Sequence, residues 1–356
     1  MLKINSGRDY KQLNSGNIPV YGTGGYMLSV NDKLSDTDAV GIGRKGTIDK
    51  PLYLKAPFWT VDTLFYCTSK ENSDVKFIYL LFQIINWKRY DESTGVPSLS
   101  KNTISSIKTY VPKVKEQDHI SKLFFSLDNT LQLHEDYLQL LYDFRSFLLQ
   151  KMFSINDTFP NLRFKQFNDK WKYKKLGEVA DIVSGGTPDT TKHDYWNGSI
   201  NWYTPAEVGN KIFVSDSQRK ITNIGLENSS AKILPVGTVL FTSRAGIGKT
   251  AILKEKGSTN QGFQSIVPKQ KFLDSYFIFS MSNILKKYGE SHGAGSTFLE
   301  ISGKELAKAK ISLPSITEQK HISKVLFKLD TIITFQKQKI DNLKKLKQFL
   351  LQNMFI

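Results

Sequence analysis

Cysteine and histidine are scarce in this chain of 356 residues. Its one cysteine, Cys67, has no partner in the chain for a disulfide, and one cysteine with five histidines cannot complete a Cys-rich zinc cluster. A chain without disulfides is typical of a reducing compartment, so we expect a cytoplasmic protein. These counts exclude a disulfide-stapled secreted domain and predict no metal site.

Long apolar runs are also missing. No cationic leader followed by an apolar core stands at the N-terminus, and no run approaches the roughly 18 apolar residues that a membrane span needs. Apolar residues nevertheless make up 40% of the chain and aromatic residues 12%, which is typical of a folded globular protein long enough for two domains. We therefore expect no membrane partner.

Acidic residues are in the minority. Lys and Arg outnumber Asp and Glu 49 to 33, which gives a net charge of +16. Residues 1–160 hold 19 basic and 17 acidic residues, whereas residues 161–356 hold 30 and 16. Such an excess favours a polyanionic partner, because each phosphate that is neutralised releases condensed counterions. Nucleic acid is the leading candidate, with heavier phosphate contact expected in the second half.

The chain contains an internal repeat. Residues 111–153 align without gaps to residues 313–355, an offset of 202 positions, with 17 of 43 residues identical. Each copy opens with a proline (Pro112, Pro314) and a Glu-Gln pair, followed by a long apolar periodicity without Gly or Pro. An acidic residue in the first turn suits the helix dipole, so each copy predicts a long helix.

The apolar positions of the two predicted helices recur at alternating spacings of four and three residues. Seven of nine are apolar in each copy, and the polar breaks fall at the same places, His134 and Arg145 in one and Gln336 and Lys347 in the other. This pattern predicts a coiled-coil seam. An antiparallel pairing sets His134 opposite Gln336 and would place the domains at opposite ends. The alternative is that each amphipathic helix packs only on its own domain.

The segments before the two helices are rich in short β-like runs bounded by Gly and Pro. We therefore expect an α+β fold: two similar domains with mixed or antiparallel sheets, joined by two long antiparallel coiled-coil helices. In this prediction Gly43-Arg44 is matched with Ser243-Arg244. The predicted boundaries are residues 1–112 for domain one, 113–160 for the first helical spacer, 161–313 for domain two and 314–356 for the second spacer.

Domain two has a leader that domain one lacks. Residues Trp171 to Ala180 precede Ile182-Val183-Ser184-Gly185, whereas the first copy starts almost at once with Ile4-Asn5-Ser6-Gly7. We therefore expect domain one to be shortened by roughly one strand or helix at its N-terminus, which bears on whether it folds independently.

Several catalytic motifs are nearly matched. Residues 41–46 fit G-x-G-x-x-G, but Pro51 and Pro57 follow where a dinucleotide site needs a helix. Residues 246–250 resemble the end of a P-loop, but Ser243 stands where its first glycine is required. The chain also lacks the Asn/Asp-Pro-Pro-aromatic element of amino-methyltransferases and a strand-borne Asp with a downstream Glu-x-Lys. We therefore predict no catalytic residue and no cofactor.

Taken together, the motifs resemble the specificity subunit of type I restriction-modification systems. Two variable globular segments alternate with two similar helices, each opening with Pro and Glu-Gln and continuing to Leu127-Asp128 or Leu329-Asp330. The junction Leu176-Gly177-Glu178-Val179-Ala180 followed by Gly185-Gly186-Thr187-Pro188 is similar to the family's pattern, and so is Pro19-Val20-Tyr21-Gly22 in domain one. The resemblance covers nearly the whole chain.

The resemblance implies a non-catalytic, DNA-reading subunit. Each domain would read one half of a bipartite site in double-stranded DNA, and the paired helices would set the gap between the halves. The helices would also dock two copies of a methyltransferase subunit, with restriction and motor subunits joining for cleavage. By the same analogy the chain binds no S-adenosylmethionine.

The expected DNA-contacting residues lie in loops that combine glycine, a cation and an aromatic or amide side chain. Arg can read guanine, Asn or Gln can read adenine, and Lys, Ser and Thr can hold phosphates. The candidates are Tyr21, Thr23, Arg44, Lys45 and Thr47 in domain one, and Thr187, Lys192, Tyr195, Arg244, Lys249, Gln261 and Gln264 in domain two. For Tyr26 and Trp196 in the same loops a packing role is favoured. For Arg44 and Arg244 a DNA contact and a structural salt bridge stay equally open.

Two functions of other classes remain as alternatives. A stand-alone nuclease or methyltransferase would act on DNA without a partner, although it would need the motifs found to be missing. A coiled-coil RNA-binding adaptor is compatible with the basic charge, and competition between duplex DNA and RNA would separate it from a DNA reader.

Overall fold

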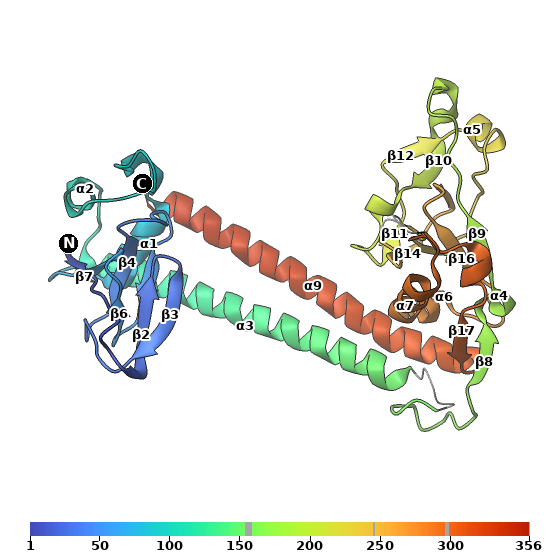
Figure 1. The fold of residues 1–356 in the computed structure, drawn as a ribbon, viewed down its shortest axis with the longest axis horizontal. Coiled ribbons are helices and arrows are strands. Elements are labelled where there is room, and N and C mark those ends of the chain that lie inside the picture. The colour runs from blue at the N-terminus through green and yellow to red at the C-terminus, as the bar shows by residue number, and fades with distance from the viewer. Residues whose placement is uncertain (154–158, 245, 296–298, 356) are drawn as a thin grey trace. The chain divides into compact units, whose positions relative to one another are not determined.

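The computed structural model describes residues 1–153, 159–244, 246–295 and 299–355. The chain divides into two compact units: unit 1 comprises Met1–Tyr137 and Gln336–Ile356, and unit 2 comprises Leu138–Phe335. Two helices of 39 residues each, α3 (Val114–Met152) and α9 (Ile316–Met354), contribute to both units (Figure 1). They lie within the two segments predicted as helical spacers, 113–160 and 314–356. The end of the first predicted spacer, 154–158, lies outside the described residues, and Phe159 and Pro160 are not helical.

Unit 1 contains two small sheets. The first is antiparallel throughout, in the order β1 (Leu2–Ser6), β7 (Leu64–Ser69), β4 (Ala39–Gly43), β5 (Leu52–Leu54). The second is mixed, in the order β3 (Gly25–Val30), β2 (Ser15–Gly22), β6 (Trp59–Thr60). The short helices are α1 (Val75–Ile84), the 3-10 turn η1 (Trp87–Tyr90) and α2 (Lys101–Ser106). Strand β4 is buried along its whole length, as its unbroken apolar and glycine sequence requires.

Unit 2 contains a larger version of the same arrangement. Its five-stranded sheet has the order β11 (Phe213–Val214), β14 (Thr250–Leu253), β13 (Val239–Phe241), β16 (Gln264–Pro268), β9 (Ala180–Ser184). A three-stranded sheet has the order β12 (Arg219–Ile221), β10 (Trp196–Tyr203), β15 (Gly257–Thr259), and β17 (Lys310–Leu313) pairs with β8 (Lys172–Lys175). The short helices are α4 (Leu176–Val179), α5 (Asn223–Glu227), α6 (Ser275–Ser280), α7 (Ser282–His292) and α8 (Gly303–Leu306), with 3-10 turns η2 (His193–Tyr195) and η3 (Pro205–Glu207).

The two units repeat one topology. The order β1-β7-β4-β5 matches β9-β16-β13-β14, and the mixed sheet β3-β2-β6 matches β12-β10-β15 with the same pattern of one antiparallel and one parallel pairing. The predicted α+β fold with two similar domains and mixed or antiparallel sheets is therefore confirmed.

The match of Arg44 with Arg244 is wrong by one residue. The carbonyl of Arg44 accepts a hydrogen bond from Leu99 N–H at 2.9 Å, and in unit 2 it is the carbonyl of Ser243 that accepts from Ile301 N–H at 3.0 Å. Arg44 is therefore the counterpart of Ser243, and Lys45 is the counterpart of Arg244. The loops of the two units differ in length, so the number of positions between equivalent residues is not the same in the strands as in the long helices. An alignment based on motifs alone is therefore wrong by one residue at this loop.

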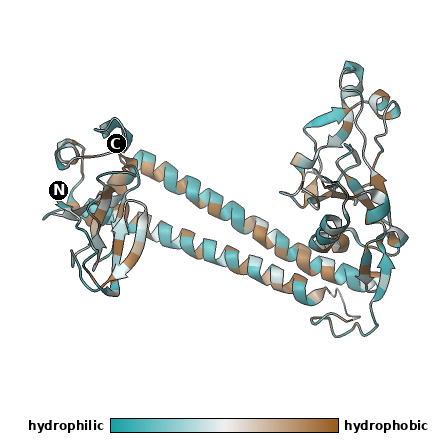
Figure 2. Cartoon of the chain, in the orientation of Figure 1, coloured by the Kyte–Doolittle hydropathy of each residue, from teal (hydrophilic) through white to brown (hydrophobic). Residues whose placement is uncertain are grey.

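The long helices pair antiparallel in the predicted register. In unit 1, Gln336 Nε2 donates to the carbonyl of His134 at 2.7 Å and lies 2.9 Å from its Nδ1. In unit 2, Arg145 binds Asp330 of the opposing helix. The view that each helix packs only on its own domain is therefore wrong. Figure 2 shows both helices banded in hydrophilic and hydrophobic colours along their length, as a paired amphipathic helix requires.

Candidate nucleic-acid interface

Three loops of unit 2 meet at one end of its large sheet. The loop that follows β9 is joined to the last residue of β15 by a hydrogen bond from Gly186 N–H to the carbonyl of Thr259 at 2.9 Å. The loop between β13 and β14 is joined to the loop between β15 and β16 by a hydrogen bond from Ser243 N–H to the carbonyl of Gly262 at 2.8 Å. A Cβ on Gly185 would lie 1.9 Å from the carbonyl oxygen of Asn260, so only glycine allows this approach.

These loops bring together four of the residues predicted to contact DNA. Thr187 donates a hydrogen bond from Oγ1 to Oε1 of Gln261, and Lys249 is exposed. Arg244 is half-buried, and among the described residues no ion pair holds its guanidinium. The described residues therefore show no salt bridge at Arg244, and a contact with DNA stays a prediction.

The loop from Thr242 to Lys249 is a tight connection between two strands. The backbone N–H of Lys249 donates to Thr242 Oγ1 at 2.9 Å, and Thr242 Oγ1 donates to the carbonyl of Gly246 at 2.7 Å. Gly246 and Gly248 have φ angles of 104° and 90°, a region that favours glycine. Strand β14 follows directly, so this Gly-Ile-Gly-Lys-Thr sequence lacks the helix of a P-loop.

Lys192 and Tyr195 lie on a different part of unit 2, beside the 3-10 turn before β10. Lys192 is exposed, whereas the half-buried Tyr195 packs beside Trp196 and Trp202. Trp196 donates from Nε1 to the carbonyl of Asp189 at 3.0 Å, and the guanidinium of Arg219 lies 3.6 Å from the centre of its ring. Trp196 therefore has the packing role that the sequence favoured.

Gln264 does not fit the predicted DNA contact. Its side chain is only 6% exposed on β16, and its Oε1 accepts a hydrogen bond from Ser184 Oγ at 2.8 Å. The sequence could not separate it from Gln261, which is exposed only three residues earlier. Gln264 is a structural residue because its amide is already bonded inside the sheet.

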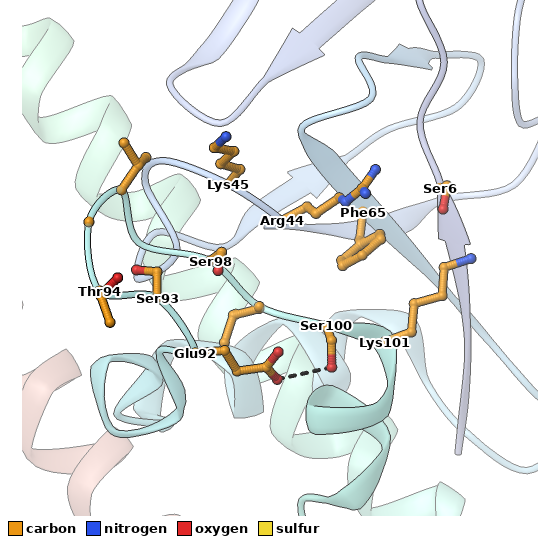
Figure 3. A pocket seen from close by; sticks show the side chains of 13 residues that line it. Ser6, Arg44, Lys45, Phe65, Glu92, Ser93, Thr94, Ser98, Ser100 and Lys101 are labelled. Atoms are coloured by element: carbon orange, nitrogen blue, oxygen red, sulfur yellow. Dashed lines mark hydrogen bonds between the residues drawn. The ribbon is translucent and has the colours of Figure 1, made fainter.

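In unit 1 the corresponding loops surround a cavity of about 820 Å³ (Figure 3). The Arg44 guanidinium lies 6.0 Å from the centre of the Phe65 ring, and Lys101 Nζ lies 5.8 Å from it. Ser6, Lys45 and residues of the 92–100 loop also line it. No ion pair to Arg44 occurs among the described residues, and three cations, Arg44, Lys45 and Lys101, line the cavity beside the Phe65 ring.

Lys101 is a candidate that sequence reasoning missed. It begins helix α2 directly after the N-cap Ser100, whose Oγ accepts from Thr103 N–H at 3.1 Å and donates to Glu92 at 2.9 Å. In the loop before α2, the carboxylate of Asp91 accepts hydrogen bonds from the N–H groups of Ser98 and Ser93. These bonds hold the pKa of Asp91 below its usual value. The signal available in the sequence was a lysine directly after a serine that could cap a helix, in a polar loop containing Gly95.

The other candidates of unit 1 lie on two neighbouring loops. A Cβ on Gly46, where φ is 103°, would lie 3.5 Å from Thr23 Oγ1, so the loops that carry Thr23 and Thr47 adjoin. Tyr21 and Tyr26 are cross-strand neighbours with ring centres 6.4 Å apart. Tyr26 is 64% exposed and its ring meets that of Tyr21 edge to face, so Tyr26 packs at the rim of the sheet and not in its core.

Neither a metal site nor a membrane-spanning segment is found in the part of the chain that the structure describes. No group of three His, Cys, Asp or Glu side chains is placed to hold a metal ion, and no helix there is both long and apolar enough to cross a bilayer. Cys67 lies buried on β7, where desolvation raises the pKa of its thiol to about 12. The thiol is therefore not a nucleophile at neutral pH.

The fold and loops define a duplicated α+β protein in which two similar sheet-rich domains are each followed by one helix of an antiparallel pair. The family described as type I restriction modification DNA specificity domain matches residues 1–142 and 168–345. These ranges include most of the chain, which therefore belongs to this family.

Named relatives are similar to parts of the chain. The MjaIX specificity subunit of Methanocaldococcus jannaschii is 36% identical over 189 residues, which are 52% of this chain and 44% of the relative. The EcoR124I/EcoR124II specificity subunit of Escherichia coli is 31% identical over 180 residues, 48% of this chain and 43% of the relative. The matched part thus spans less than half the length of these two relatives.

Solved structures resemble the whole chain in fold. The S subunit of a type I restriction-modification system from M. genitalium superposes with a TM-score of 0.67 at 15% identity, covering 100% of this chain and 94% of the other. The HsdS subunit from Thermoanaerobacter tengcongensis has a TM-score of 0.51 at 16% identity, covering 99% and 96%. At these identities the likeness concerns the fold alone.

Proposed function

We propose that this chain is the non-catalytic DNA-recognition subunit of a type I restriction-modification complex in the cytoplasm. Unit 1 and unit 2 each read one half of a bipartite site in double-stranded DNA. The observation that carries the proposal is that the same loop of the repeated topology holds one cation in each unit, Lys45 in unit 1 and Arg244 in unit 2, for which the described residues supply no ion pair. A duplicated reading surface suits a two-part target.

Direct base contacts are assigned to a few side chains. Arg244 with Thr187 and Gln261 in unit 2, and Arg44 with Lys45 and Lys101 in unit 1, supply the donors and acceptors that read base edges. Lys192 and Lys249 are exposed cations suited to phosphate contacts, which position a protein without reading sequence. Tyr21, Thr23, Thr47 and Tyr195 remain candidates at the margins of these loops.

The paired helices are proposed to set the gap between the two halves of the target. A helix of 39 residues is about 58 Å long at 1.5 Å per residue, more than the roughly 34–36 Å of one DNA turn. Because the two helices are locked by the His134–Gln336 contact and by ion pairs, their length acts as a fixed spacer rather than a flexible linker.

The helices also carry apolar side chains that the described structure leaves exposed, which supports a role in docking partners. In unit 1 Leu133 is 69% exposed and Phe349 is 61% exposed, and in unit 2 Leu140 is 62% and Phe335 is 65% exposed. Exposed large apolar side chains at this density mark an interaction surface. We assign them to two copies of a methyltransferase subunit, with restriction and motor subunits joining for cleavage.

The test is a methylation assay with purified components. The chain alone should neither methylate nor cleave DNA, and it should confer sequence-specific adenine methylation only when its methyltransferase partner is added. The partner without this chain serves as the control. Methylation or cleavage by the isolated chain would favour a stand-alone enzyme, and preference for RNA in competition with duplex DNA would favour an RNA-binding adaptor.

A further inference from the structure

The two units differ in one connection of their mixed sheets. In unit 1, strands β2 and β3 are joined by Thr23 and Gly24 alone, and Gly22 pairs with Gly25 across this turn. In unit 2, the matching strands β10 and β12 are joined by residues 204–218, which we call the unit 2 insert. The insert contains the turn η3 and the strand β11, which pairs with β14 at the edge of the large sheet (Figure 1).

One carboxylate ties the two ends of the insert together. Glu207 Oε2 accepts a hydrogen bond from the N–H of Thr204 at 2.7 Å and another from its Oγ1 at 2.8 Å. The other oxygen, Oε1, accepts from the N–H of Gln218 at 2.7 Å. Because both oxygens of Glu207 are bonded within the insert, the segment leaves and re-enters the sheet in a fixed geometry.

The insert lies against two of the three loops that meet at the end of the large sheet. A Cβ on Gly262 would lie 2.9 Å from Cγ of Pro205, so the start of the insert packs on the loop between β15 and β16. A Cβ on Gly209, where φ is 101°, would lie 3.4 Å from carbons of the Lys249 side chain. The middle of the insert therefore packs on the loop between β13 and β14, beside a residue already assigned to DNA.

Two exposed polar residues, Asn210 and Lys211, follow this contact directly. They stand between Gly209, which lies against Lys249, and Ile212, whose carbonyl accepts a hydrogen bond from Ile252 N–H at 2.7 Å. Within the described part of the chain, neither side chain has a hydrogen-bond or ion-pair partner. An amide and an ammonium group are thus held at the reading end of unit 2 without a partner from the protein itself.

The acidic residues of the insert are both engaged elsewhere. Glu207 is bonded to the ends of the insert, and Asp216 lies 3.0 Å from Lys220 Nζ. The bond to Lys220 holds the pKa of Asp216 below its usual value. The exposed stretch 209–211 carries only the positive charge of Lys211, which suits it to a polyanion.

We propose that the unit 2 insert is a further part of the DNA-reading surface, in which Asn210 reads an adenine and Lys211 holds a phosphate. The inference rests on the proposed function of the chain. A side-chain amide presents the donor and the acceptor that match N7 and N6 of adenine in the major groove, whereas a lysine positions the protein without reading sequence. Thr23 and Gly24 of unit 1 offer neither group, so this contact belongs to one half of the target only.

The experiment measures methylation of a duplex library of randomised sequence by the full chain together with its methyltransferase partner. We expect Asn210→Ala to lower discrimination at one A·T pair about tenfold, in the same half of the target that Arg244→Ala relaxes. Asn210→Arg should shift the preference at that pair from A·T to G·C, because a guanidinium binds guanine through two hydrogen bonds. A change of preference separates a base contact from a merely structural effect.

Lys211→Ala tests the second contact of the insert. It should weaken binding to all duplexes alike and reduce the salt dependence of binding by about one phosphate contact, with the target unchanged. Binding to one duplex at several salt concentrations, followed by fluorescence anisotropy, gives this value. A loss of affinity confined to some sequences, or no loss at all, would overturn the assignment of Lys211.

Asn168→Ala is the matched control, because Asn168 is an exposed asparagine of unit 2 outside the insert, and its variant should keep the parent target. Circular dichroism should show unchanged folding in all variants, since the substituted residues are exposed. The inference is overturned if both Asn210 variants methylate the parent target unchanged, or if the relaxed pair lies in the other half. A parent complex that methylates without sequence preference would contradict the proposed function as well, so the two failures are distinguishable.

Discussion

Two carboxylates of the long helices have the same sequence context but different environments. Asp330 is 5% exposed, binds Arg145 through two nitrogens and accepts from Tyr276 Oη at 2.6 Å. Burial and this bond to Asp330 raise the pKa of Tyr276. The counterparts Asp128 and Lys347 form an ion pair that is 36% and 22% exposed. Arg145 and Lys347, the second polar residues of the two seams, therefore each form an ion pair with the opposing helix.

Removing the cation that pairs with the buried Asp330 should cost more stability than removing the cation that pairs with Asp128. We expect Arg145→Leu to lower the free energy of unfolding by about 3–5 kcal/mol, because Asp330 would stay buried without its charge partner. The matched variant Lys347→Leu should cost less than about 1 kcal/mol, because Asp128 keeps access to water. Urea unfolding followed by circular dichroism gives both values. Equal losses in the two variants would show that burial does not distinguish the pairs.

Arg244 and Lys249 lie on one loop but are assigned different contacts. Arg244→Ala should cost about 1–3 kcal/mol of binding and relax recognition in one half of the target only, as expected for loss of a bidentate base contact. Lys249→Ala should weaken binding to all sequences alike and reduce the salt dependence by about one phosphate contact. Binding to half-site variants at several salt concentrations measures both effects. An unchanged half-site preference in Arg244→Ala would make Arg244 structural.

At the scale of the element, the helix pair is defined by a polar contact at its centre. Gln336 is 7% exposed and donates to His134 across the seam. Buried polar residues in a seam set register at some cost in stability. The contact between Gln336 and His134 therefore sets the register in which the two helices pair more than it stabilises the pair.

Replacing both central residues should raise stability. We expect His134→Leu with Gln336→Leu to increase the free energy of unfolding by roughly 1–2 kcal/mol, since an apolar pair fills the seam. His134→Leu alone should lower it by about 0.5–1.5 kcal/mol, because Gln336 Nε2 loses its contact with the imidazole but keeps its bond to the backbone carbonyl of residue 134. Thermal and urea unfolding of the three proteins test this. A double variant less stable than the parent would mean that the polar pair stabilises the helices outright.

For the molecule as a whole, the helix pair predicts how the target can be redesigned. Seven residues inserted after Leu131 in α3, with seven inserted before Lys339 at the paired position of α9, preserve the phase of the seam. Each helix grows by about 10 Å, which corresponds to roughly three base pairs at 3.4 Å each. We expect the unspecified gap in the target to lengthen by that amount while both half-sites stay the same. Methylome sequencing provides the measurement, and altered half-sites with the original gap would contradict the spacer role.

The amino-acid sequence by itself determined the repeated helices and their pairing. A seam is a local periodicity, and two copies with breaks at the same places can align their polar residues in few ways, so His134 could be matched with Gln336 in advance.

Only the tertiary structure decided which loop residues share an environment. The partner of a glutamine side chain depends on which strand or loop lies beside it, and the sequence does not show this. Gln264, which bonds to Ser184 inside the sheet, and Gln261, which bonds to Thr187 in the loops, could therefore not be told apart in the sequence. Loops of different length shift the offset between the copies, so Arg44 proved equivalent to Ser243. Lys101 joins Arg44 at Phe65 through contacts between segments far apart in the chain. Such contacts depend on packing in three dimensions, which no local pattern encodes.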